Sequence, residues 1–130
     1  MFNSLTNKGA GSFSSKRRGD AAEDLALEHL QQSGLQLRMR NYRTPGRGGG
    51  EIDLIMRDQD GTCVFVEVRQ RRSASHGGAA ASVGPIKQQR IIFAARHYLL
   101  RLGAQPPCRF DVVTIEGGAI EWLRGAFDAG

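Results

Sequence analysis

Cysteine and long apolar segments are scarce in this sequence, and both shortages exclude classes of protein. Its two cysteines, Cys63 and Cys108, lie far apart among 130 residues and lack the paired spacing of a zinc site. A reduced intracellular protein is the simplest interpretation, although a disulfide between them stays open. No apolar run approaches the length of a membrane span, and residues 1–19 have no apolar core typical of a signal peptide. We therefore expect a cytoplasmic protein without a membrane partner.

Acidic residues are also in the minority, since 13 Asp and Glu stand against 18 Lys and Arg for a net charge of +5. A positive excess favours polyanionic partners through counterion release, so we expect nucleic acid as the partner.

The length of the chain suits one domain and is too short for two. Residues 1–15 are rich in Ser, Gly and Asn with little to bury, which predicts a flexible N-terminal arm ahead of a single domain over residues 16–130.

Hydrophobic spacing and turn residues divide that domain into seven elements. Helical spacing predicts helices over residues 17–33 and 85–102, and Gly34 and Gly103 are placed to end them. Strands are predicted by alternating or apolar runs over residues 35–42, 51–57, 62–71, 108–115 and 119–123. The order αβββαββ indicates an α/β fold with a central mixed β-sheet flanked by α-helices.

The turn DQDG between two of these strands fixes which side chains face each other. Asp58 suits the first position of a type I turn in a three-residue hairpin loop, which pairs it with Thr62. Residues whose numbers sum to 120 then face each other, so Asp53 faces Glu67. Glu51 faces Arg69 by the same rule. The opposite, apolar side carries Ile52, Leu54, Met56, Val64, Val66 and Val68.

Two facing carboxylates repel each other, so Asp53 and Glu67 need a cation between them or a shared proton. Mg²⁺ commonly takes one or two carboxylates, keeps several waters and receives its remaining ligands from substrate phosphates. The pair is therefore a candidate site for Mg²⁺ or Mn²⁺. The alternative is an ion-pair cluster without metal, in which Arg69 pairs with Glu51 and Arg71 screens the remaining charge.

Basic residues near the acid pair are candidates for contacts with phosphates. Arg71 ends the second strand of the hairpin and Arg72 follows it, and Lys87 and Arg90 lie on the second helix. These side chains would bind nucleic acid, or they form a solvated face. Glu23 lies on the edge of the apolar stripe of the first helix, where its carboxylate must reach the rim, find a partner or favour the helix N-terminal dipole.

Several separated blocks of the sequence carry a family resemblance. The blocks GDAAEDLALEHL, RNYRTPGRGGGEIDLIMRD, FVEVRQRR and CRFDVVTI resemble those of the bacterial UPF0102 (YraN-like) family, over residues 18–122. That family is similar to archaeal Holliday-junction resolvases and other nucleases of the restriction-endonuclease-like, PD-(D/E)xK, superfamily. The resemblance implies a restriction-endonuclease-like fold and a metal-dependent endonuclease acting on DNA, with branched and single-stranded forms as candidate substrates. Many junction resolvases dimerise, so a homodimer stays open.

The same resemblance assigns roles to four residues. Asp53 matches the first acid of the superfamily, Glu67 the second acid, and Glu23 the helix-borne acid of resolvase-like members. Arg69 stands where the family usually has lysine, because this chain reads EVR for EVK. Arginine stays protonated and presents a planar fork suited to phosphate, so we expect Arg69 to stabilise charge rather than transfer a proton. A nucleic-acid-binding protein that keeps the nuclease fold with little or no turnover is therefore the alternative function.

Overall fold

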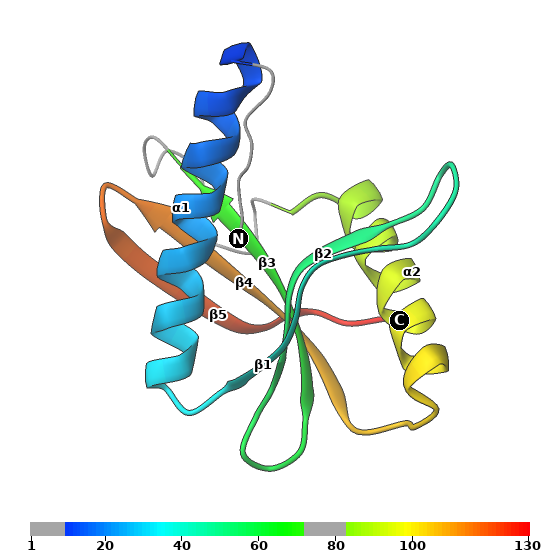
Figure 1. Ribbon diagram of the computed structural model, residues 1–130. Coiled ribbons are helices and arrows are strands. Elements are labelled where there is room, and N and C mark those ends of the chain that lie inside the picture. The colour runs from blue at the N-terminus through cyan, green and yellow to red at the C-terminus, as the bar shows by residue number, and fades with distance from the viewer. Residues whose placement is uncertain (1–9, 72–82) are drawn as a thin grey trace, which may run out of the picture.

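The protein, seen in a computed structural model that describes residues 10–71 and 83–130, folds as a mixed sheet with two helices (Figure 1). The elements in chain order are α1 (Ala10–Gln32), β1 (Gln36–Arg43), β2 (Glu51–Arg57), β3 (Cys63–Gln70), α2 (Pro85–Leu102), β4 (Cys108–Glu116) and β5 (Ala119–Phe127). The predicted α/β class and the order αβββαββ are confirmed. Neither helix in these ranges is long and apolar enough to cross a membrane.

The five strands lie side by side in the order β1-β2-β3-β4-β5. β3 and β4 are parallel, whereas all other neighbours are antiparallel. Parallel neighbours need a crossover connection, and α2 lies within the segment that joins β3 to β4. The sheet is therefore mixed, and its central strand β3 contacts an antiparallel partner on one side and a parallel partner on the other.

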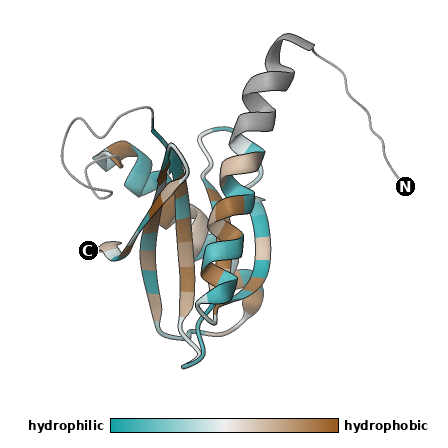
Figure 2. Cartoon of the chain, turned by 90° about the vertical axis from the view of Figure 1, so that its left-hand side faces the viewer, coloured by the Kyte–Doolittle hydropathy of each residue, from teal (hydrophilic) through white to brown (hydrophobic). Residues whose placement is uncertain are grey.

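The two helices cover opposite faces of this sheet. Successive side chains of a strand point to opposite faces, and in β3 Val64 and Val66 pack with α1, whereas Cys63 and Phe65 pack with α2. Figure 2 shows apolar residues both on α1 and on strands of the sheet beside it. Over residues 19–32, the part of α1 whose side chains are described, the buried residues are Ala22, Ala26 and Leu30, and those of α2 are Ile91, Ile92, Ala94 and Ala95.

Both helices end at the glycines that the sequence indicates. Gly34 has φ 99°, and its N–H donates to Gln31 O while the N–H of Leu35 donates to Leu30 O, each at 3.0 Å. These two hydrogen bonds form a Schellman motif, which satisfies backbone carbonyls that would otherwise lack a partner at the end of α1. Gly103 has φ 74° and donates its N–H to Leu99 O at 3.0 Å.

The beginning of α1 differs from the expectation. The helix begins at Ala10 rather than near residue 17, so residues 10–15 of the predicted arm form its first turns, and residues 1–9 lie outside the described part of the chain. No proline interrupts residues 10–17, and once later turns are packed against the sheet, each added residue gains a backbone hydrogen bond at little nucleation cost. The polar composition of this stretch concealed its helical potential.

The hairpin of β2 and β3 has the predicted register over its first pairs. Asp58 N–H donates to Thr62 O at 2.9 Å, Gly61 has φ 91°, and the paired residues run from Arg57 with Cys63 to Leu54 with Val66. The assignment of Ile52 to the same face as Leu54 was wrong, because Ile52 packs in the cluster with α2. Ile52 pairs with Tyr42 of β1, and the residue before Tyr42 is Asn41, which has a φ of 56°. This positive φ interrupts the regular alternation of side chains between the two faces of the sheet along β1.

The last strand is longer than the sequence indicates. β5 continues to Phe127, beyond the predicted end near residue 123, and its pairing with β4 shifts register between Phe110 and Val112. Phe127 stacks on Phe110 with ring centroids 5.0 Å apart, which gives the added residues apolar area to bury.

Candidate functional site

The acid pair lies where the regular pairing of β2 and β3 ends. The ladder stops at Leu54 and Val66, and the Asp53 side chain then reaches toward β3, where its Oδ2 accepts the Val68 N–H at 2.8 Å. This hydrogen bond fixes the Asp53 carboxyl beside Glu67, and each of the two carboxyls perturbs the pKa of the other. The structure therefore brings together the two acids that the hairpin register predicted.

Glu67 is almost fully buried, with 4% of its surface exposed, and two cations contact it. Arg69 Nη1 lies 3.5 Å and Lys87 Nζ 3.7 Å from Glu67 Oε2. The other oxygen, Oε1, is buried without a hydrogen-bond partner in the described residues. A buried carboxylate oxygen without a donor is costly, so this atom is available to a ligand.

Burial controls the protonation of this pair. Burial and the Glu67 charge together raise the pKa of Asp53 to about 7, although the Val68 N–H opposes both effects. Burial also raises the pKa of Glu67, whereas the charges of Lys87 and Arg69 and the nearby Asp53 carboxyl lower it. The raised pKa values of both carboxyls therefore favour retention of a proton by the pair.

Lys87 reaches the pair from α2, whereas the sequence predicted for it only a contact with nucleic acid or a place on a solvated face. Its Nζ lies between Glu67 and Glu51, 3.9 Å from Glu51 Oε2, so one cation links two acids. The predicted pairing of Glu51 with Arg69 is not what the structure contains, because Glu51 pairs with Arg43 of β1 at 3.4 Å and with Lys87. A lysine of helix α2 therefore supplies the positive charge beside Glu51 that the sequence predicted from Arg69 of β3.

Glu23 of α1 forms an ion pair, which is one of the three arrangements that the sequence left open for it. Arg40 Nε of β1 lies 3.3 Å from Glu23 Oε1, and Arg40 Nη2 lies 2.7 Å from Asp24. Burial raises the pKa of Glu23, and the charge of Asp53 adds to this increase, whereas Arg40 opposes it. Glu23 is therefore within the electric field of the acid pair, although its ion pair is with Arg40.

The remaining basic candidates lie in different surroundings. Arg90 Nε donates to Gly49 O at 3.2 Å, so its guanidinium ties α2 to the loop between β1 and β2. Arg71 follows β3 and donates its backbone N–H to Ile115 O at 2.9 Å. Arg72 lies outside the described residues. The described part of the chain contains no cluster of three or more His, Cys, Asp or Glu side chains arranged to hold a metal.

One buried acid escaped the sequence analysis. Asp111 of β4 accepts hydrogen bonds from Arg109 Nε at 3.1 Å, Trp122 Nε1 at 3.0 Å and the Gly125 N–H at 2.9 Å. Arg109 also reaches Asp58 in the hairpin turn at 2.9 Å. The signal in the sequence was a single aspartate within the apolar run FDVVTI. Because protein donors satisfy its oxygens, Asp111 stabilises the β4 and β5 edge rather than binding a ligand.

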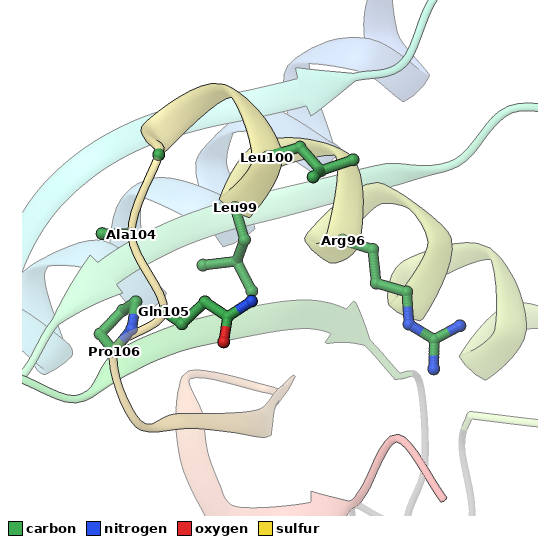
Figure 3. Close-up of a pocket in the computed structure, with 7 residues that line it drawn as sticks. Arg96, Leu99, Leu100, Ala104, Gln105 and Pro106 are labelled. Atoms are coloured by element: carbon green, nitrogen blue, oxygen red, sulfur yellow. The ribbon is translucent and has the colours of Figure 1, made fainter.

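A pocket of about 860 Å³ opens at the other end of α2 from Lys87 (Figure 3). Leu99, Leu100 and Pro106 contribute apolar walls, and Arg96 lines it as well. Its residues are separate from the acid pair, so it is not part of the candidate metal site.

Comparison with known proteins agrees with the blocks found in the sequence. Residues 22–115 match the model of the uncharacterised protein family UPF0102. A UPF0102 protein of Albidiferax ferrireducens is 74% identical over 115 residues, covering 88% of this chain and 90% of its own. Another, from Paracidovorax citrulli, is 68% identical over 112 residues, covering 86% and 83%. With the family model matching most of its length and relatives of this similarity, the chain belongs to the UPF0102 family.

Proposed function

We propose that this protein is a metal-dependent nuclease that hydrolyses phosphodiester bonds of DNA, with Mg²⁺ or Mn²⁺ held by Asp53 and Glu67. The observation that carries the proposal is the buried acid pair, in which Glu67 Oε1 has no donor among the described residues. Two carboxylates suit Mg²⁺, which completes its shell with water and substrate phosphate, so the absence of a third acid in the described cluster is compatible with this metal.

The residues around the pair fit the handling of a phosphodiester. A divalent cation at this site would lower the pKa of a coordinated water and polarise a phosphoryl oxygen. Arg69 is 41% exposed at its side chain, so its permanently charged fork can turn from Glu67 to a phosphate. Lys87 holds a second positive charge beside Glu67 from α2, where it would offset the charge that develops on the phosphate in the transition state.

Cleavage assays test the proposal. Purified protein is incubated with Mg²⁺ or Mn²⁺ and a panel of branched, nicked, single-stranded and duplex DNAs. We expect metal-dependent cleavage of at least one form, abolished by Asp53→Asn and by Glu67→Gln and unchanged by Asp128→Asn, an exposed aspartate at the far end of the chain. Cleavage that survives both site substitutions, or no cleavage of any DNA with either metal, would overturn the assignment.

A second candidate function is nucleic-acid binding without turnover, and one observation favours it. Arg69 and Lys87 both contact Glu67 Oε2, so protein cations can neutralise part of the pair without metal. In that case DNA affinity falls steeply with salt and persists in Asp53→Ala, because that substitution removes repulsion rather than a ligand. Binding that requires metal and both acids would exclude this alternative.

A further inference from the structure

Cys63 and Cys108, distant in sequence, are neighbours in the sheet. Cys63 is the first residue of β3 and Cys108 the first of β4, and the parallel register makes them direct partners. Both cysteines are free thiols. They lie at the beginning of β3, whereas Glu67 lies further along the same strand, so the two sites are separate.

The geometry of paired strands suits a disulfide. Neighbouring strands lie about 4.7–4.9 Å apart, within the range of about 4.4–6.8 Å between the Cα atoms of disulfide-bonded cysteines. Directly paired residues point to the same face, and each of the two thiols shifts the pKa of the other. Because both residues begin their strands, the backbone there can adjust more readily than at mid-strand.

The two thiols differ in access. Cys108 is exposed and donates its S–H to Pro106 O at 3.3 Å, whereas Cys63 is 6% exposed. Pro106 also lines the pocket at the end of α2, which gives a small molecule space beside this segment (Figure 3). Burial raises the pKa of Cys63 to about 12 and raises that of Cys108 as well, but contact with Cys63 lowers the pKa of Cys108. Cys108 is therefore the thiol that reacts first.

We propose that Cys63 and Cys108 are a modification site at which a small-molecule disulfide, such as glutathione disulfide, is exchanged for a reversible intramolecular disulfide. The Cys108 thiolate attacks one sulfur of the small disulfide, so a mixed disulfide forms and one small thiolate leaves. The Cys63 thiol loses its proton to solvent, and its thiolate attacks the Cys108 sulfur and expels the second small thiolate. Two protein thiols are oxidised and one small-molecule disulfide is reduced to two thiols. The closed ring contains α2.

The experiment follows the full-length chain in glutathione redox buffers by intact mass spectrometry after acid quenching. We expect wild-type protein to lose the mass of two hydrogen atoms and to become resistant to alkylation, with both changes reversed by a reductant. Oxidised protein should also unfold at a higher urea concentration than reduced protein, because the crosslink restricts the unfolded chain.

Two variants separate the roles of the thiols. Cys63→Ser should accumulate a glutathione adduct on Cys108, since the resolving thiol is absent, whereas Cys108→Ser should acquire neither adduct nor crosslink while folded. If the wild-type chain stays fully reduced, retains a stable glutathione adduct, or forms the disulfide only in denaturant, the proposal is wrong. The wild-type measurement decides this point even where a variant fails to fold.

Discussion

Asp60 and Asp53 each accept a backbone N–H, yet their pKa values move in opposite directions. The Thr62 N–H holds the pKa of fully exposed Asp60 below its usual value. Asp53 accepts the Val68 N–H at a similar distance, but burial and the Glu67 charge raise its pKa to about 7. At the scale of single residues, desolvation outweighs a hydrogen bond, and this difference distinguishes the candidate site from ordinary surface carboxylates.

Asp53→Asn is expected to stabilise the metal-free protein at alkaline pH. The pKa of Asp53 rises from 3.8 to about 7 on folding, so the folded state holds a proton that the unfolded state has lost between these values. The stability contributed by this group is complete below pH 3.8 and is lost as pH rises through about 7. The variant should therefore exceed wild type by roughly 2 kcal/mol near pH 8, and by much less near pH 5.

Urea unfolding at the two pH values measures this difference. Asp128→Asn is the matched control, because Asp128 is exposed and the same substitution there should leave the free energy of unfolding nearly unchanged. A variant less stable than wild type near pH 8 would show that the Asp53 charge is stabilised rather than strained.

Lys87→Met is expected to raise the pKa of Asp53 by roughly one pH unit, because it removes the positive charge that favours the Asp53 carboxylate. Arg69→Met should have a smaller effect on Asp53, since Arg69 contacts Glu67 and is the more exposed of the two cations. The carboxyl carbon of Asp53, followed by NMR through a pH titration, reports both shifts. Arg96→Met removes the same charge from the far end of α2 and should leave the titration unchanged; an equal shift there would refute a local role for Lys87.

At the scale of elements, the local pattern predicted the parts of the fold that depend on neighbouring residues. The turn from Asp58 to Gly61 set the hairpin register as far as Leu54 and Val66, and beyond that point the Asp53 carboxyl reaches the Val68 N–H beside Glu67. Ile52 was misplaced because its orientation follows Asn41 of another strand, whose positive φ no alternation reveals. The Lys87 contact was missed for a similar reason, since it depends on how α2 packs against β2 and β3.

Gly50→Ala tests the contact that positions α2. A Cβ at Gly50 would lie 1.9 Å from Arg90 O, which is helix backbone and cannot rotate away. We expect α2 to be displaced and the free energy of unfolding to fall by about 3 kcal/mol, as measured by urea denaturation. Gly19→Ala is the control, because a Cβ there meets nothing within 4 Å on helix α1, and it should stabilise slightly. Equal effects of the two substitutions would contradict the close approach.

At the scale of the whole molecule, the acid pair lies between two layers that act on it differently. On one side of the sheet the charge of Asp53 raises the pKa of Glu23 on α1. On the other side Lys87 of α2 contacts Glu67. The chain as a whole carries a net charge of +5, which favours approach of a polyanion to this otherwise acidic centre. A buried acid pair in a basic protein is the combination that a metal and a nucleic-acid phosphate would complete.

The most direct test of the metal site is calorimetric titration of the metal-free protein with Mn²⁺ near pH 8 and near pH 6. We expect one ion per chain near pH 8 and weaker binding near pH 6, where Asp53 retains its proton and the metal must displace it. Asp53→Asn and Glu67→Gln should each weaken binding by at least about tenfold, whereas Asp128→Asn should not. Binding that is absent from the wild-type protein, or that is unaffected by either site substitution, would contradict a metal site at Asp53 and Glu67.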